Sequence, residues 1–183
     1  MIEDISCKGV AASILMSQLH AMFRTLVALD LPLKQMVDRA SRTCCESTAT
    51  SHYATLVCGR AERDGGVELY TAGHLRPPVS DAKTVFELTA PGPPFGMFCD
   101  QRFDVVRVSL ERGGTLLLST DGFTESGISS AQEFGRPRLA ELFRHDAFAP
   151  PRQLIERCLA ELSGFLAGEP RRDDLMIMAL RRD

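Results

Sequence analysis

At residues 116–125 the chain reads Leu-Leu-Leu-Ser-Thr-Asp-Gly-Phe-Thr-Glu, and this stretch decides the fold. Three consecutive leucines, after the Gly113-Gly114 turn and a β-branched threonine, predict a short strand buried on both faces. The strand runs into Asp121, and the glycine after it lets the backbone turn sharply away. The stretch therefore predicts a carboxylate on a stiff support at the rim of a core, as a hard divalent cation requires. An ordinary Asp-Gly turn is the alternative interpretation.

The composition restricts the class of protein. With 183 residues, 44% of them hydrophobic, the chain is long enough for one domain with a substantial core. The net charge is -3 and no Lys/Arg run is interleaved with aromatic residues, so we expect no nucleic-acid partner. Acidic residues at the N-terminus argue against a signal peptide, and the longest apolar stretch, 10–23, is shorter than the ~20 residues of a membrane span. We expect a soluble, cytoplasmic protein that binds no membrane.

The cysteines show neither paired Cys-x-x-Cys spacing nor the density of a small secreted scaffold. We expect all six to be reduced thiols that fill space: Cys7, Cys44, Cys45, Cys58, Cys99 and Cys158. Cys44 and Cys45 are adjacent, and neighbouring residues on a helix point about 100° apart, so we expect no zinc pair there.

Hydrophobic periodicity predicts helices near both ends of the chain and strands between them. Apolar residues recur at helical spacing over 10–27, where Ser6 is the candidate cap, and over 33–44, which Pro32 opens. Strands are expected at 53–59, 67–70, 84–88, 103–110 and 115–119, the first two joined by the hairpin residues 64–66. Two stiff Pro/Gly loops interrupt them at 72–78 and 91–96. Later helices are expected at 136–143 and 150–166, before a buried last strand at 175–180.

Acidic residues stand at three expected strand ends. Asp4 ends the N-terminal strand, Asp121 ends the Leu-rich strand, and Asp173-Asp174 precede the last one. Acids at strand ends around a common core can converge, and two metal ions about 3.5 to 4 Å apart require several carboxylates. Each position also has an ordinary interpretation: a helix cap for Asp4, a turn for Asp121, and a solvated charged loop at 171–174.

Six motifs, in order along the chain, resemble those of the sporulation stage II protein E type of metal-dependent protein serine/threonine phosphatase, in the PPM superfamily. Asp4-Ile5-Ser6-Cys7-Lys8-Gly9-Val10-Ala11-Ala12 resembles the family pattern Asp-Val-Ser-Gly-Lys-Gly-Val-x-Ala. Residues 119–125 resemble Thr-Asp-Gly-Val-Thr-Glu. The other matches are Thr71-Ala72-Gly73-His74 with Pro77-Pro78, the Pro-Pro-Phe-Gly turn at 93–96, Glu133-Phe134-Gly135, and Asp173-Asp174.

This resemblance implies an α+β fold, a four-layer α/β/β/α sandwich of two antiparallel sheets flanked by helices, as a single domain over residues 1–183. It also implies a metal site. Asp4 would bridge two Mn²⁺ or Mg²⁺ ions, the backbone carbonyl of Ile5 would contact one of them, and Asp121 and Asp173 would hold the other. A water activated by the ions would attack phosphorus, so no cysteine nucleophile is required. Lys8 would contact the substrate, or else is a solvated lysine at a helix start.

The implied substrate is phosphoserine or phosphothreonine on a STAS-domain anti-sigma-factor antagonist in sigma-factor regulation, with a sensor domain or protein upstream. His74 could be a general acid, but its Gly/Pro loop favours a structural hydrogen bond. We expect Glu125 to order its loop rather than to bind metal.

The sequence departs from the family pattern at its start. Family members begin with two more strands that carry a Gly-Asp-x-x-Asp-like segment, whose acid completes the first metal site, whereas here Asp4 follows Met1 by three residues. We therefore expect an N-terminally truncated domain with an incomplete first site. Cys7, Thr71 and Met176 replace the family's glycine, asparagine and threonine. The alternative function is a catalytically impaired or inactive binding module in the same pathway, and a third is an unrelated metal hydrolase.

Overall fold

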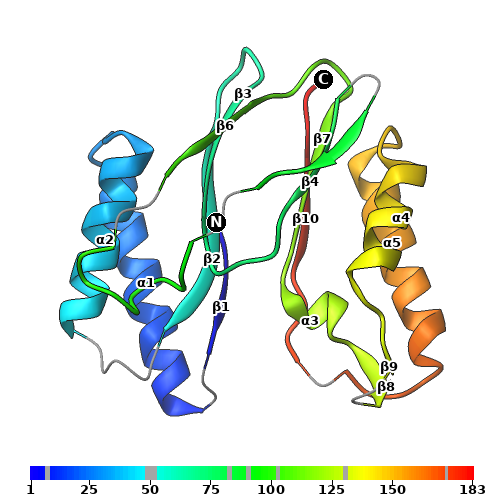
Figure 1. Ribbon diagram of the computed structural model, residues 1–183, viewed down its shortest axis with the longest axis horizontal. Helices are drawn as coiled ribbons and strands as arrows, with labels where there is room; N and C mark the ends of the chain where they lie inside the picture. Colours follow the sequence, from blue (N-terminus) through cyan, green and yellow to red (C-terminus); the bar gives the residue numbers. More distant parts are fainter. Residues whose placement is uncertain are drawn as a thin grey trace. The chain divides into compact units, whose positions relative to one another are not determined.

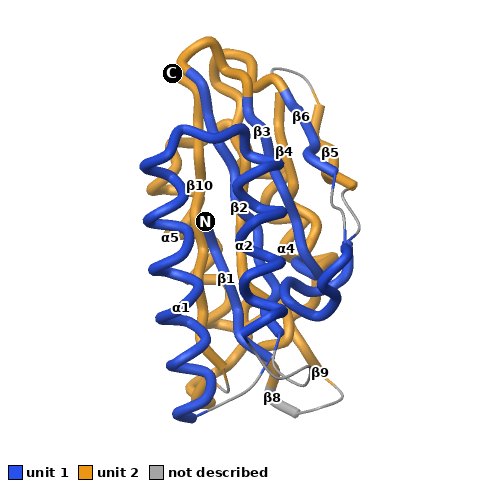
Figure 2. The backbone as a smooth tube through the Cα atoms, turned by 90° about the vertical axis from the view of Figure 1, so that its left-hand side faces the viewer, with its two compact units in different colours: residues 1–62, 67–74, 90–108 blue, residues 63–66, 75–89, 109–183 orange. Residues whose placement is uncertain are grey.

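The chain folds into two units in the computed structural model, each with a four-stranded sheet and helices of its own (Figure 2). The structure describes residues 1–6, 9–47, 53–81, 84–89, 92–101, 104–129, 132–171 and 173–183. Unit 1 comprises Met1–Glu62, Val67–His74 and Ala90–Val108, and unit 2 comprises Arg63–Gly66, Leu75–Thr89 and Ser109–Asp183.

The sheet of unit 1 has the strand order β1-β2-β3-β6 (Figure 1). Its strands are β1 (Ile2–Ile5), β2 (Ala54–Ala61), β3 (Gly66–Ala72) and β6 (Val106–Ser109). β1 and β2 are antiparallel, with Asp4 opposite Thr55 and Ile5 opposite Ala54. β2 and β3 form the antiparallel pair that the Asp64-Gly65-Gly66 turn predicts.

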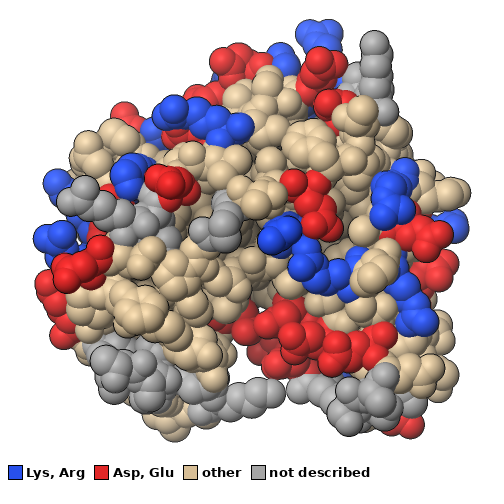
Figure 3. Space-filling model, in the orientation of Figure 1, with Lys and Arg blue, Asp and Glu red and all other residues tan. Residues whose placement is uncertain are grey.

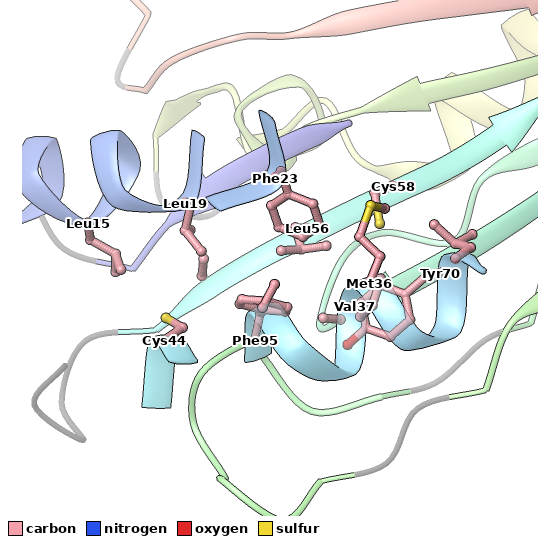
Figure 4. Close-up of a cluster of buried hydrophobic side chains, with 14 residues drawn as sticks. Leu15, Leu19, Phe23, Met36, Val37, Cys44, Leu56, Cys58, Tyr70 and Phe95 are labelled. Atoms are coloured by element: carbon pink, nitrogen blue, oxygen red, sulfur yellow. The ribbon is translucent and has the colours of Figure 1, made fainter. Parts of the chain in front are cut away.

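Helices α1 (Val10–Val27) and α2 (Leu33–Ser47) supply the core of unit 1. Their apolar residues pack with those of β2 and β3 in one cluster of buried side chains (Figure 4). Phe95, from the irregular segment 92–101, points into this cluster, and its ring centroid lies 5.8 Å from that of Phe23. The 3.6-residue period therefore predicts the buried face of α2, whereas for α1 it also includes Val10, Ile14 and Val27, which are exposed.

α1 is also long and apolar enough to cross a membrane, by length and composition alone. Leu15, Leu19 and Phe23 are buried in the core of unit 1, whereas Val10 and Ile14 are exposed. The apolar side chains of α1 thus lie on two faces, of which one has a packing partner in unit 1.

The sheet of unit 2 has the strand order β10-β7-β4-β5, and every pairing in it is antiparallel. Its strands are β4 (Pro78–Ser80), β5 (Val85–Glu87), β7 (Thr115–Ser119) and β10 (Ile177–Arg181). All five residues of β7 are buried, as the three leucines predict. The short helix α3 (Asp121–Thr124) and the hairpin of β8 (Gly127–Ser129) and β9 (Gln132–Glu133) follow β7.

Helices α4 (Arg136–Asp146) and α5 (Pro151–Leu166) complete unit 2, and each has proline in its first turn, where the missing N–H costs nothing. Their buried residues form one cluster with Leu117 of β7 and Phe123 of α3. Phe134 joins α3 to α5, because its ring meets those of Phe123 and Phe165 edge-on at 5.4 and 5.5 Å.

Several expectations from the sequence need correction. Ser6 does not cap α1, which begins after Gly9; instead the Ser6 hydroxyl accepts a hydrogen bond from the Tyr53 N–H at 3.2 Å and joins β1 to β2. β4 was not predicted: it begins at Pro78, the last residue of the loop expected at 72–78, and forms because it pairs with β7 on one side and β5 on the other. The expected turn at Asp121 is the start of α3.

The prediction of six reduced cysteines is wrong for two of them. Cys45 and Cys99 form a disulfide, with their Cα atoms 5.3 Å apart. The two lie 54 residues apart in the chain and meet only because segment 92–101 returns to the end of α2. Cys44, Cys58 and Cys158 are buried thiols that take part in no disulfide among the described residues, and Cys7 lies outside those residues.

Candidate functional site

Thr120 joins the two acidic segments of unit 2, the start of α3 and the residues before β10. Its backbone N–H donates to the Met176 carbonyl at 3.1 Å, and its hydroxyl accepts from the Met176 N–H at 3.0 Å. The same hydroxyl donates to the Asp174 carbonyl at 3.3 Å. Asp121 follows Thr120 directly, so these bonds fix the start of α3 beside the approach to β10.

Gly122 permits the close approach of these segments. A Cβ atom added at Gly122 would overlap the backbone carbonyl of Asp174 and would lie 3.6 Å from the Cβ of Asp173. Two further bonds hold the short helix: the Ser126 hydroxyl donates to the Gly122 carbonyl at 2.6 Å, and the Glu125 N–H donates to the Asp121 carbonyl at 2.7 Å. The segments that carry Asp121 and Asp173 therefore lie side by side.

Four carboxylates lie around α3. Partial burial raises the pKa of Glu125, and the nearby negative charges of Asp121, Glu133 and Asp173 raise it further. Figure 3 shows acidic side chains gathered on this side of the molecule, below the centre of the view. Like charges so close repel one another, and a bound cation would relieve that repulsion.

Asp4 and Ile5 lie in unit 1, near the end of β1. Asp4 is half-buried and stands opposite Thr55, whose hydroxyl is hydrogen-bonded to Nδ1 of His74 at 3.3 Å. This is a structural hydrogen bond of the kind that the Gly/Pro loop predicts for His74. Ile5 packs against the core of unit 1, which anchors the strand that carries Asp4.

Next to Asp4, β1 carries a second carboxylate, that of Glu3. Glu3 is only 8% exposed, and burial raises the pKa of its carboxyl, against the opposing effects of His20 and the N-terminal amine. Lys8, the candidate substrate contact, and Cys7 lie outside the described residues.

The oxygen donors of Asp121 and Asp173 fit a hard divalent cation such as Mn²⁺ or Mg²⁺. Among the residues that the structure describes, no three His, Cys, Asp or Glu side chains form a group able to hold a metal ion. The pair in unit 2 offers two carboxylates, and Asp4 and the Ile5 carbonyl belong to the other unit. The full ligand set therefore stays a prediction.

Comparison with known proteins identifies the family. The family model described as stage II sporulation protein E (SpoIIE) matches residues 1–183. The chain belongs to the SpoIIE family. Phosphoserine phosphatase RsbP of Bacillus subtilis is 27% identical over 182 residues, which cover 95% of this chain and 43% of RsbP. The chain spans less than half the length of the curated relatives it matches.

Solved structures confirm the predicted fold class for this SpoIIE-family chain. The SiaA-PP2C domain of Pseudomonas aeruginosa is 26% identical, with a TM-score of 0.79 over 99% of this chain and 74% of the SiaA chain. A crystal structure of RsbX in complex with magnesium shows the same fold at 12% identity, with a TM-score of 0.68 over 97% of this chain and 77% of RsbX. The α+β fold with two antiparallel sheets and flanking helices is therefore that of PP2C phosphatase domains.

Two positioning residues, Thr120 beside Asp173 and Thr55 beside Asp4, were not among the residues predicted from the sequence. Thr120 and Thr55 neither resemble metal ligands nor stand out in composition, yet their hydroxyls bond to the segments that carry Asp173 and His74. A signal existed for Thr120, since it lies inside the Thr-Asp-Gly motif. None existed for Thr55, because only strand pairing places it opposite Asp4.

Proposed function

We propose that this chain is a metal-dependent protein serine/threonine phosphatase domain. One observation carries the proposal: Thr120 and Gly122 hold the Asp121 and Asp173 segments side by side at the ends of β7 and β10. A protein that needed only an Asp-Gly turn there would gain nothing from four crowded carboxylates, among which burial and the three neighbouring charges raise the pKa of Glu125. Family membership and the phosphatase relatives support the same conclusion.

In this proposal Asp121 and Asp173 hold one Mn²⁺ or Mg²⁺ ion, and Asp4 with the Ile5 carbonyl contributes to binding of a pair of ions. When bound, such ions supply Lewis-acid stabilisation of the phosphoryl oxygens and activate water near neutral pH. The protein's own contribution is positional. β7 and α3 fix Asp121, Thr120 fixes the approach to β10, and the core under Ile5 fixes Asp4. Lys8 is the candidate contact to the phosphate.

The proposed substrate is a phosphorylated STAS-domain anti-sigma-factor antagonist in the cytoplasm, with a sensor domain or protein as the upstream partner. RsbP, a relative at 27% identity, is named a phosphoserine phosphatase, which agrees with a phosphoserine substrate. The pI near 5.8 and the acidic surface around α3 make a bound cation necessary for an anionic substrate to approach.

Hydrolysis of p-nitrophenyl phosphate, with and without Mn²⁺, tests the proposal on the purified chain. We expect Mn²⁺-dependent turnover that falls at least 100-fold in Asp121→Asn and Asp173→Asn, with weaker Mn²⁺ binding by calorimetry. The matched control is Glu161→Gln, which removes an exposed carboxylate on α5 and should leave turnover unchanged. Release of phosphate from a phosphorylated STAS-domain protein then tests the substrate.

Two results would contradict the phosphatase proposal. The first is Mn²⁺-dependent turnover that survives both asparagine variants. The second is no turnover of either substrate by a chain that circular dichroism shows to be folded. Retained binding of the STAS-domain protein in that second case would favour the binding module instead.

A further inference from the structure

The Cys45–Cys99 disulfide joins the last turns of α2 to the irregular segment 92–101 of unit 1. Cys99 is exposed and Cys45 is half-buried, so small thiols and oxidants can reach the bond. Nothing in the proposed phosphatase reaction uses either sulfur. In the reducing cytoplasm that the sequence predicts, such a bond forms only when an oxidant is present.

Segment 92–101 is anchored to the rest of unit 1 through Phe95, through backbone hydrogen bonds and through the disulfide. Phe95 is fully buried in the core between α1 and α2 (Figure 4), and its backbone exchanges two hydrogen bonds with Ala54, at 2.7 and 3.1 Å. The Gly92 carbonyl accepts from the Gly73 N–H at 2.9 Å. Apart from the isolated bridge between Phe95 and Ala54, the segment forms no helix or strand between residues 92 and 101, and the disulfide links its far end covalently to α2.

The contacts of segment 92–101 are made to residues next to Asp4 and its strand partner. Ala54 is the strand partner of Ile5, and Thr55 is the partner of Asp4. Gly73 precedes His74, which is hydrogen-bonded to Thr55. Loss of order in segment 92–101 would therefore expose the start of β2, which pairs with the strand that carries Asp4.

We propose that Cys45 and Cys99 are a reversible redox switch that sets the order of segment 92–101 and of the β1–β2 edge. In the oxidising direction, the two thiols lose two protons and two electrons to a disulfide such as oxidised glutathione, which leaves as two thiols. Hydrogen peroxide can take the same two electrons and two protons, and is reduced to two waters. In the reducing direction, a dithiol attacks one sulfur, forms a mixed disulfide, and leaves as its own disulfide. The consequence for turnover, higher activity in the oxidised state, rests on the proposed phosphatase function.

Hydrogen–deuterium exchange of the metal-free chain tests the switch without any assay of activity. Reduction by dithiothreitol should raise the exchange rates of the Ala54 and Phe95 amides at least tenfold, because opening of the segment becomes easier. The amides of β7 and β10, in unit 2, should not respond and are the internal control. Cys99→Ser should show the exchange rates of the reduced chain and should not respond to dithiothreitol. Cys45→Ser, which removes the other sulfur, should behave in the same way.

Three results would overturn the proposal. They are the absence of a Cys45–Cys99 cross-linked peptide after treatment with oxidised glutathione or peroxide, a disulfide that dithiothreitol cannot reduce in the folded chain, and equal amide exchange in both redox states.

Mn²⁺-dependent turnover, measured in parallel, should be at least twofold higher in the oxidised chain and insensitive to redox state in Cys99→Ser. If Asp121→Asn leaves turnover unchanged, the phosphatase proposal fails, while the exchange data still decide the switch.

Discussion

Replacement of Gly122 by alanine is the perturbation that most directly probes the Asp121–Asp173 arrangement. The new Cβ would overlap the Asp174 carbonyl oxygen and would lie 3.0 Å from its carbonyl carbon. Real Cβ contacts stay beyond 3.0 Å, so the Asp173-Asp174 segment must move by about 1 Å relative to α3. A displacement of about 1 Å at a catalytic site costs on the order of 100-fold in rate.

The expected cost in stability is smaller. Overpacking costs about 1 to 3 kcal/mol, and the helix propensity of alanine offsets up to about 1 kcal/mol of it. For a chain of this length, a net loss of about 1 to 2 kcal/mol lowers Tm by roughly 2 to 8 °C. We therefore expect Gly122→Ala to be folded, to melt slightly earlier, and to lose most Mn²⁺ affinity and turnover.

The assay compares Gly122→Ala with Gly164→Ala, a matched substitution on α5. A Cβ added at Gly164 meets no atom within 4 Å, so this variant should keep full turnover and raise the melting temperature by a few degrees, from about 1 kcal/mol of helix propensity. Thermal melts, Mn²⁺ titration calorimetry and p-nitrophenyl phosphate hydrolysis are measured on both. Gly122→Ala with more than half of the wild-type turnover would refute the inference that close approach of the two segments matters.

Three further predictions follow from burial and charge. Glu125→Gln removes one of four crowded charges, so the melting temperature of the metal-free chain should rise by about 1 to 3 °C. The rise should vanish when Mn²⁺ is present. An unchanged melting temperature would show that the charges do not interact. Phe95→Ala should cost about 3 to 5 kcal/mol in urea unfolding, because the ring is fully buried, and a cost below about 1 kcal/mol would exclude it from the core. Burial raises the pKa of Cys58 to about 12, so iodoacetamide at pH 8 should label it only in the unfolded chain; rapid labelling of the native chain would contradict its burial.

Much of the fold could be predicted from local sequence. The triple leucine predicted β7, the Asp-Gly-Gly turn predicted the β2–β3 hairpin, and helical spacing predicted the buried faces of α2 and α5. These features depend on side-chain periodicity and turn chemistry, which act over a few residues. The order of the six motifs also predicted the family, which the family model confirms.

Other features depended on contacts between distant residues. β4 forms because a neighbouring strand, β7, satisfies its backbone, and α3 forms where a turn was expected because Phe123 anchors it in the core of unit 2. The Cys45–Cys99 bond contradicts an expectation drawn from cysteine spacing, since spacing does not report where segment 92–101 returns.

By itself, then, the sequence determined the acids that are candidates for metal binding and the elements that carry them. Only the tertiary structure decided that Thr120 and Gly122 bring Asp121 and Asp173 together, and that Thr55 stands between Asp4 and His74. The physical reason is that a motif specifies local backbone and donor chemistry, whereas proximity is set by strand register and close packing across many residues.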